Sequence, residues 1–251
     1  FTVAKATQTA LAFTSPGSAV WGDEVTAAVS GGSGTGATSF SATAGTAGCT
    51  IDASSGVVEF TSAGTCTITA NKAGDTNYLV ADAESQTLTI TKAAQTVTFT
   101  STVPANPLPN GTYTPTATAT SELGTSLSLS AGDGSVCSLS TGVVTFLTTG
   151  TCTVAAAQPG DDRFAAATTQ TQIITVGSLN QSIIVTIPDD VDYGTPGFGL
   201  NAAATSDLAV TVTSADTDIC TVATLVVTPV DIGDCELTVA QAGNNQYAAA
   251  S

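Results

Sequence analysis

The chain contains one eight-residue stretch in three versions. Ala63–Ala70 reads AGTCTITA, Thr149–Ala156 reads TGTCTVAA, and Ile232–Val239 reads IGDCELTV. In each version a glycine lies two positions before a cysteine, and apolar residues occupy alternate positions after it. Alternation with a period of two is the pattern of a β-strand that buries one face. The stretch therefore predicts the same strand in three copies of one structural unit.

The three versions recur at a spacing that is typical of small domains. Their cysteines, Cys66, Cys152 and Cys235, lie 86 and then 83 residues apart. Solenoid repeats are shorter, at about 20–50 residues. Each copy therefore predicts a separate small domain, which we call a module.

Each module contains an earlier cysteine as well, 17, 15 and 15 residues before the later one. Six cysteines allow 15 pairings, and their equal placement favours one disulfide within each module. In a domain this small, closing a loop of about 15 residues contributes roughly 3 kcal/mol. Disulfides are typical of oxidising compartments, so we expect an extracellular or cell-surface protein. The predicted pairs are Cys49–Cys66, Cys137–Cys152 and Cys220–Cys235.

Short alternating runs between turn residues predict an all-β fold. Threonine or serine alternates with apolar residues in Thr96–Thr100 and in Ser126–Ser130, as on pleated surfaces. Turn signals such as Asn110-Gly111 separate the runs, and no stretch of ten residues carries a helical apolar stripe. We predict three tandem immunoglobulin-like antiparallel β-sandwich modules, each with one disulfide.

A second repeated string marks the module boundaries. Val3–Thr9 reads VAKATQT, Ile90–Thr96 reads ITKAAQT, and Val176–Ser182 reads VGSLNQS. An apolar strand is expected on either side of each string, so about four residues link successive modules. A link this short predicts a semi-rigid, extended array. Three modules in line would have a total length of roughly 100 Å. The junctions are marked by Lys5-Ala6 and Lys92-Ala93, and the modules are placed at residues 4–90, 91–176 and 177–251.

Both ends of the chain align with parts of modules. Residues 1–3 align with Leu88–Ile90 and Ile174–Val176, the predicted final strands of modules 1 and 2, while module 3 lacks the counterpart of Thr169–Val176. Two explanations remain open. The chain is a window from a longer array, or the first strand of one chain completes the last module of the next by strand addition.

The chain resembles bacterial immunoglobulin-like repeats of the MBG/Big type. The resemblance is carried by the cysteine stretch, by Ala73-Gly74-Asp75 with the following Tyr78, and by the Lys-Ala-x-Gln-Thr link. Trp21-Gly22 fits the same pattern, whereas module 3 has Ser178 where the other links have lysine. The resemblance covers essentially the whole chain. It implies a structural role in a large secreted or surface protein, as a spacer, an adhesin stalk or a fibre component.

Composition excludes several classes of function. Twenty acidic residues against four basic ones give a net charge of −16, which is unsuited to nucleic acid. No run of 18 apolar residues is present, so no membrane insertion is expected. The absence of histidine excludes Ser-His-Asp and Cys-His catalysis, and the absence of C-x-x-C argues against zinc. We predict that the protein is not an enzyme.

The densest acidic segment is DDVDYG, which contains Asp189, Asp190 and Asp192. It half-resembles a calcium loop but lacks the length and the final glutamate of an EF-hand. Two interpretations remain open: a solvated turn after a strand at Ile183–Ile187, or a weak calcium site. No other cofactor is predicted.

Four aromatic residues recur at matching module positions, which favours packing in cores or at junctions over sugar stacking. They are Trp21, Phe164, Tyr193 and Tyr247.

The sequence thus predicts a structural repeat segment of a bacterial extracellular protein. A self-assembling filament subunit with strand complementation between chains is one alternative, and a glycan- or surface-binding module is another. The expected partners are further copies of the same repeat or of the same chain, with glycans or a cell surface as the alternative.

Overall fold

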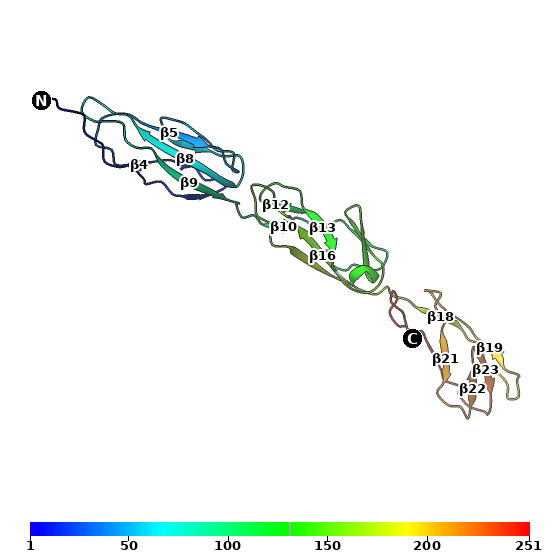
Figure 1. Cartoon of the computed structure of the whole chain (residues 1–251). Helices are drawn as coiled ribbons and strands as arrows, with labels where there is room; N and C mark the ends of the chain where they lie inside the picture. The colour runs from blue at the N-terminus through cyan, green and yellow to red at the C-terminus, as the bar shows by residue number, and fades with distance from the viewer. Residues whose placement is uncertain (131) are drawn as a thin grey trace. The chain divides into compact units, whose positions relative to one another are not determined.

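The computed structural model describes residues 1–130 and 132–251 of the chain, which form β-strands joined by turns (Figure 1). The one helical element among these residues is a 3-10 turn, η1 (Asp133–Ser135). The all-β prediction is confirmed.

The strands fall into three consecutive groups along the chain, one around each disulfide. Module 1 contains β1 (Ala12–Phe13), β2 (Ser18–Val20), β3 (Val25–Thr26), β4 (Val29–Ser30), β5 (Thr38–Thr43), β6 (Thr50–Ile51), β7 (Val57–Glu59), β8 (Gly64–Lys72) and β9 (Glu84–Thr91). Module 2 contains β10 (Val97–Phe99), β11 (Thr112–Tyr113), β12 (Ala117–Ala119), β13 (Ser126–Leu129), β14 (Cys137–Ser140), β15 (Val143–Phe146), β16 (Gly150–Ala157) and β17 (Gln170–Val176). Module 3 contains β18 (Ile183–Thr186), β19 (Phe198–Gly199), β20 (Asn201–Ala204), β21 (Thr211–Ser214), β22 (Cys220–Ala223), β23 (Val226–Pro229) and β24 (Leu237–Ala240).

By packing, the chain divides into two compact units. The first comprises residues 1–98, 118–126 and 157–169, and the second comprises residues 99–117, 127–156 and 170–251. Module 2 therefore contributes one part to each unit. The module boundaries proposed from the sequence stay predictions, and each unit is described by itself.

Module 1, in the first unit, is a two-layer sandwich. One sheet has the strand order β2-β9-β8-β5, and the other has the order β3-β7-β6. β8 pairs antiparallel with β9, which places Cys66 opposite Leu88. Apolar side chains alternate inward along these strands, as the sequence pattern predicts. The core that both sheets enclose includes Val25, Val58, Cys66, Ile68, Leu88 and Ile90.

One pairing departs from the predicted antiparallel arrangement. β2 pairs with β9 in parallel, with Ser18 opposite Thr89. Other pairs, such as β16–β17 and β22–β23, are antiparallel as predicted.

The core of module 2 lies in the second unit. The sheets β11-β15-β14 and β13-β16-β17 enclose it, and Cys152 lies opposite Ile174 in the β16–β17 pair. The buried residues include Tyr113, Val144, Phe146, Cys152, Val154, Ile174 and Val176. The arrangement repeats that of module 1, because the final strand of the module again pairs with the strand that contains the second cysteine.

Module 3 has a smaller core, also in the second unit. Its sheets have the orders β19-β23-β22, β21-β24 and β18-β20, and its buried cluster consists of Leu200, Val212, Cys220 and Val227. β24 pairs with β21 on one side. Within residues 132–251, no strand pairs with its other side.

The six cysteines form three disulfides, each within one module. The pairs are Cys49–Cys66, Cys137–Cys152 and Cys220–Cys235. Their Cα atoms are 6.0, 5.9 and 5.7 Å apart, within the usual range for a disulfide. The prediction of tandem β-sandwich modules with one disulfide each is confirmed.

Candidate functional site: the contacts between successive modules

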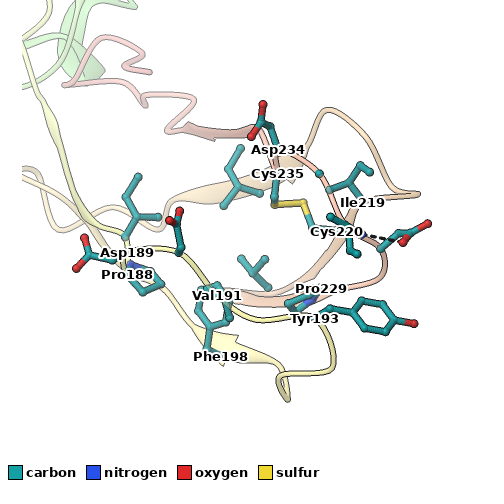
Figure 2. A pocket seen from close by; sticks show the side chains of 17 residues that line it. Pro188, Asp189, Val191, Tyr193, Phe198, Ile219, Cys220, Pro229, Asp234 and Cys235 are labelled. Atoms are coloured by element: carbon teal, nitrogen blue, oxygen red, sulfur yellow. Dashed lines mark hydrogen bonds between the residues drawn. A yellow bond between two sulfur atoms is a disulfide. The ribbon is translucent and has the colours of Figure 1, made fainter.

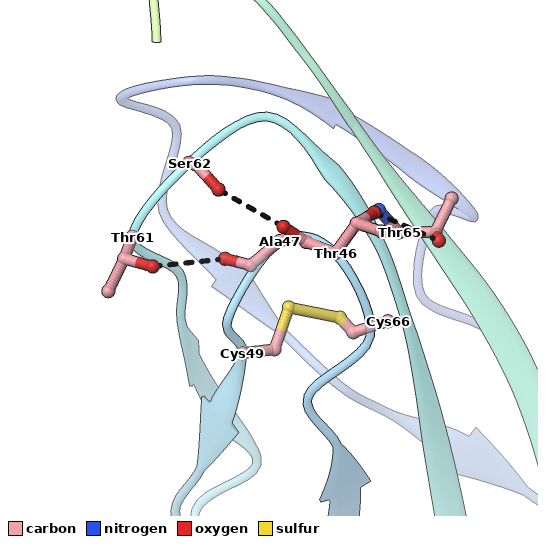
Figure 3. The surroundings of a disulfide bond; sticks show 7 residues. All are labelled: Thr46, Ala47, Cys49, Thr61, Ser62, Thr65 and Cys66. Carbon is pink, nitrogen blue, oxygen red and sulfur yellow. Dashed lines mark hydrogen bonds between the residues drawn. A yellow bond between two sulfur atoms is a disulfide. The ribbon is translucent and has the colours of Figure 1, made fainter. Parts of the chain in front are cut away.

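The first disulfide lies beneath a polar segment at one end of module 1 (Figure 3). The Thr61 hydroxyl donates to the Ala47 carbonyl at 3.4 Å, and the Ser62 hydroxyl donates to the Thr46 carbonyl at 3.2 Å. The Thr65 backbone N–H donates to the Thr46 hydroxyl at 2.9 Å. The Thr61 and Ser62 backbone N–H groups also donate to the Ala47 carbonyl, so the disulfide and these bonds together hold residues 61–65 against residues 46–47.

A glycine is required where this segment enters the cysteine strand. Gly64 has a φ of +148°, and an added Cβ would lie 2.5 Å from the Thr46 hydroxyl oxygen. The equivalent glycines, Gly150 and Gly233, have φ values of +137° and +156°. L-residues rarely adopt this backbone conformation, which explains why glycine recurs two positions before each cysteine.

The Ala-Gly-Asp segment of the sequence repeat forms a tight loop in which one side-chain oxygen accepts two backbone N–H bonds. Asp161 Oδ1 accepts from Arg163 and Phe164, both at 2.8 Å. Asp75 Oδ1 accepts from Asn77 and Tyr78 in module 1, also at 2.8 Å. In module 3 the amide oxygen of Asn244 takes this place and accepts from Gln246 and Tyr247. We call these three structures the Asx loops.

Hydrogen bonding to the ionised carboxylate favours the charged form of the two aspartates. The backbone N–H of Thr35, followed by those of Asn77 and Tyr78, lowers the pKa of Asp75 to about 2. The backbone N–H groups of Arg163 and Phe164 lower the pKa of Asp161. Asn244 carries no titrating group, so the third Asx loop has the same geometry without this pH dependence.

Each Asx loop holds the link string of its own module. Ala93 N–H donates to the Arg163 carbonyl at 2.9 Å, and Ala165 N–H donates back to the Ala93 carbonyl at 2.8 Å. The same parallel bridge joins Ala6 to Tyr78 and Leu179 to Tyr247. The predicted junction residues Lys5-Ala6 and Lys92-Ala93 therefore run alongside the Asx loops.

A glutamine in each link string strengthens this attachment. Gln95 is buried and its Nε2 donates to Gln158 Oε1 at 2.8 Å and to the Ala165 carbonyl at 2.6 Å. Gln181 repeats both bonds with Gln241 and the Ala248 carbonyl. Buried amides are stable only when their polar groups are satisfied, and these glutamines meet that requirement.

Within the first unit, the Asx loop of module 2 contacts residues 61–65 of module 1, the segment that lies over the first disulfide. Ala63 N–H donates to the Asp162 carbonyl at 2.9 Å, and Arg163 Nε donates to the Thr61 carbonyl at 3.3 Å. The Arg163 guanidinium also lies over the Trp21 ring, whose edge meets Phe60 with a centroid separation of 5.6 Å.

Within the second unit, the Asx loop of module 3 makes the equivalent contact with module 2. Thr149 N–H donates to the Asn245 carbonyl at 2.8 Å, and Gln246 Nε2 donates to the Leu147 carbonyl at 3.0 Å. Thr149 and Leu147 lie at the same positions before Gly150 as Ala63 and Thr61 do before Gly64. The same two hydrogen bonds therefore form at both junctions.

The four recurrent aromatic residues have different surroundings. Phe164 and Tyr247 are half-buried in the Asx-loop bridges, and Trp21 is half-buried under Arg163. These positions agree with the packing interpretation. Tyr193 does not, because 70% of its surface is exposed. Its counterpart Trp21 is covered by the following module, and no residue within 132–251 covers Tyr193 in that way.

The acidic segment lies in the connection between β18 and β19. β18 ends at Thr186, one residue earlier than the predicted strand, and Tyr193-Gly194 form a turn. The structure does not bring Asp189, Asp190 and Asp192 together as a ligand set. Across residues 1–130 and 132–251, no group of three or more His, Cys, Asp or Glu side chains is placed to hold a metal ion. Calcium binding here stays a prediction.

No helix in the described part of the chain is long and apolar enough to cross a membrane.

Sequence reasoning missed the residues that make the junctions. The repeated motif contained Asp75 and Asp161, but their role in receiving two backbone N–H groups was not predicted. Arg163 was overlooked because it occurs in one module only. The recurrence of Gln8, Gln95 and Gln181 in the link string was a signal that could have identified the attachment.

The sequence matches no protein-family profile and no curated protein. Among solved structures, Drosophila N-cadherin EC1-4 is 13% identical with a TM-score of 0.29, over 97% of this chain and 74% of that one. Mouse cadherin-23 EC22-24 is 14% identical with a TM-score of 0.31, over 96% and 98%. A C-terminal fragment of intimin, solved in complex with the intimin-binding domain of its translocated receptor, is 18% identical with a TM-score of 0.25, over 72% and 67%.

Similarities this weak carry no functional argument. The fold rests on the chain's own strands, cores and disulfides, which make it a tandem of immunoglobulin-like β-sandwich modules.

Proposed function

We propose that the chain is a structural repeat segment of a bacterial extracellular protein, of the MBG/Big immunoglobulin-like type. Its role is that of a semi-rigid spacer, as an adhesin stalk or a fibre component, and it requires no catalysis. The bacterial assignment depends on the cysteine stretch and the link string. The mechanical role depends on the junctions.

The repeated junction carries this proposal. Each link string is bonded to the Asx loop of its own module. The Asx loops of modules 2 and 3 are also bonded to the module before them. A bend at the link would break the Ala63–Asp162 or the Thr149–Asn245 hydrogen bond, depending on the junction. Because water competes for such bonds, each contributes only about 1 kcal/mol, so several acting together favour one orientation without locking it.

Small-angle X-ray scattering tests the spacer role. A semi-rigid array is expected to have a maximum dimension on the order of 100 Å. Inserting Gly-Gly-Ser after Lys92 should broaden the distance distribution of the chain, because the Asx loop no longer positions the link. The matched control is the same insertion between Thr141 and Gly142, a β-turn inside module 2, which should leave the distribution nearly unchanged. A native chain that scatters like the Lys92 insertion variant would contradict the proposal.

A further inference from the structure

A hollow on the outer face of module 1 has a composition that the spacer role does not explain. It lies over the sheet β3-β7-β6 and has a volume of about 830 Å³. Its lining includes the aromatic side chains of Trp21 and Phe60, the apolar side chain of Val57, and the carboxylates of Glu24 and Glu59. Among the described residues that line it, none is basic. The hollow therefore combines aromatic and apolar surface with negative charge.

The register of this sheet places the two glutamates side by side. Val25 pairs with Val58 in antiparallel register, and both of these side chains are buried in the core. The neighbouring positions therefore point outward, and Glu24 lies opposite Glu59 on the solvent-facing side. Both glutamates are exposed. Like charges at directly opposite positions of neighbouring strands destabilise a sheet, so this pair is unfavourable in the module by itself.

Neither glutamate carboxylate has a partner of its own. Within residues 1–130 and 132–251, no hydrogen bond or ion pair reaches either of these side chains. Asp23, which also lines the hollow, is engaged, because its Oδ2 accepts the Val20 backbone N–H at 2.8 Å. The chain has only four basic residues. A cation from another molecule is therefore the group that would balance Glu24 and Glu59.

The aromatic wall of the hollow already contacts a cation of the same chain. The Arg163 guanidinium lies over the Trp21 ring, and the edge of that ring meets Phe60. Arg163 is not among the lining residues, so it leaves the hollow open. Aromatic rings attract guanidinium groups through the negative face of their π-system. The contact shows that the surface at Trp21 accommodates a group of this kind.

The glutamate pair belongs to module 1 alone. In module 2, Thr112 lies opposite Thr145 at the corresponding positions. In module 3, the pairing of β19 with β23 places Gly197 opposite Thr228. A contribution to the folding of the module would be expected in all three copies. A feature that is confined to one copy, and that is unfavourable for the sheet, indicates a role outside folding.

The hollow in module 1 also differs from the cavity of module 3. That cavity has a volume of about 430 Å³ and lies beside the Cys220–Cys235 disulfide (Figure 2). Its carboxylates lie in the segments between strands, not opposite one another in a sheet. Its lining includes side chains that pack against the core of module 3, such as Phe198 and Leu237. The cavity therefore lacks the paired charge of module 1.

We propose that the hollow of module 1 binds an arginine side chain of a partner protein. Residues at directly opposite positions of neighbouring strands have Cβ atoms about 4.5–5.5 Å apart, so one guanidinium can reach both carboxylates. Its five donors lie in a planar fork and serve two carboxylates at once, unlike the compact ammonium of lysine. The aliphatic stem lies against Val57, and the guanidinium lies beside the aromatic wall. One module of the array thus docks a partner, while the other two act as spacers.

The fluorescence of Trp21, the only tryptophan in the chain, reports binding directly. Titration of the full chain with acetyl-Gly-Arg-Gly-amide should change the emission to saturation, with a dissociation constant of about a millimolar. The neutral, isosteric peptide acetyl-Gly-citrulline-Gly-amide should cause no saturable change. Raising the salt concentration to about 1 M, where the screening length is about 3 Å, should weaken binding of the arginine peptide.

A pair of double variants separates the site from the overall charge. Glu24→Gln with Glu59→Gln should weaken binding about tenfold or more. This variant should melt no lower than the native chain, because glutamine keeps the shape of the side chain and removes the repulsion. The matched control is Asp82→Asn with Glu84→Gln, which removes the same charge from exposed positions of module 1 outside the hollow. The control should bind the arginine peptide as the native chain does.

Three results would overturn the proposal. The first is the absence of a saturable change in the native chain, and the second is equal binding of the citrulline peptide. The third is an equal loss of affinity in the two double variants, which would show that net charge alone attracts the peptide. The spacer role does not depend on this site and would stand in a chain whose scattering remained extended without peptide binding.

Discussion

The guanidinium carbon of Arg163 lies 5.2 Å from the centre of the Trp21 ring. Arg163 is the only arginine and Trp21 the only tryptophan in the chain, and 142 positions of sequence separate them. A cation over an aromatic face is favourable by about 0.5–1 kcal/mol at an exposed site. Both junctions have the same two hydrogen bonds. The first junction has the Arg163–Trp21 contact in addition.

Arg163→Ala should weaken the first junction by about 1–2 kcal/mol, because it removes the ring contact and the bond to Thr61. Since Trp21 is the only tryptophan, its fluorescence reports this site directly. We expect a red-shifted emission and a lower urea midpoint by fluorescence. Arg163→Gln, which imitates Gln246 at the second junction, should restore much of the midpoint but not the emission. An unchanged emission in the alanine variant would contradict the stacking.

Stability should fall in acid through the Asx loops. The folded pKa of Asp75 is about 2, below the usual value near 3.9 for aspartate. A lowered folded pKa contributes stability that is fully present above pH 4 and is lost as the pH falls from about 4 towards 2. Asp75→Asn keeps the loop geometry seen at Asn244 and removes the titration. The urea midpoints of the native chain and of this variant, measured from pH 7 to pH 2, should therefore converge at the acid end. A difference between the midpoints that stays constant over this range would refute the contribution of Asp75 ionisation to stability.

The disulfides should be reduced in a fixed order. Cys66 and Cys152 are buried, whereas Cys235 is exposed, and thiolate attack requires access to a sulfur. Under limiting dithiothreitol, mass spectrometry of alkylated peptides should find Cys220–Cys235 open first. Loss of either buried disulfide should cost its module about 2–5 kcal/mol. Simultaneous opening of all three would argue against the difference in burial.

Gly64→Ala should destabilise module 1 by about 1–3 kcal/mol, because alanine is strained at this φ and its Cβ meets the Thr46 hydroxyl. Gly142→Ala provides a comparison. It also has a positive φ, but nothing lies within 4 Å of its added Cβ. The loss at Gly64 should exceed the loss at Gly142, both because of this contact and because a φ of +148° is less accessible to alanine than the +79° of Gly142. Equal losses in the two thermal melts would contradict this expectation.

The two interpretations of the acidic segment that contains Asp189, Asp190 and Asp192 predict different responses to calcium. A solvated turn should melt at the same temperature after dialysis against EDTA and in calcium chloride at about the millimolar concentrations that weak extracellular sites require. A rise of several degrees in calcium, lost in Asp190→Asn, would establish the site that the sequence suggested.

The repeat made most of the fold predictable. The cysteine stretch recurs at module spacing, so the strands, the disulfide partners and the sandwich class could be inferred without coordinates. The parallel pairing of β2 with β9 was not predicted, because alternation of apolar residues shows which face is buried but not the direction of the neighbouring strand.

The sequence by itself determined what is local or repeated: the alternating strands, the glycine before each cysteine, and the link strings. Only the tertiary structure decided which surfaces meet. The Asp162 carbonyl and the Ala63 N–H are backbone groups that every residue except proline possesses, so the residue types at these positions do not predict their hydrogen bond. The cavity beside Cys235 is likewise lined by residues that lie far apart in the sequence, such as Ile187, Phe198 and Leu237, and only the tertiary structure brings them together.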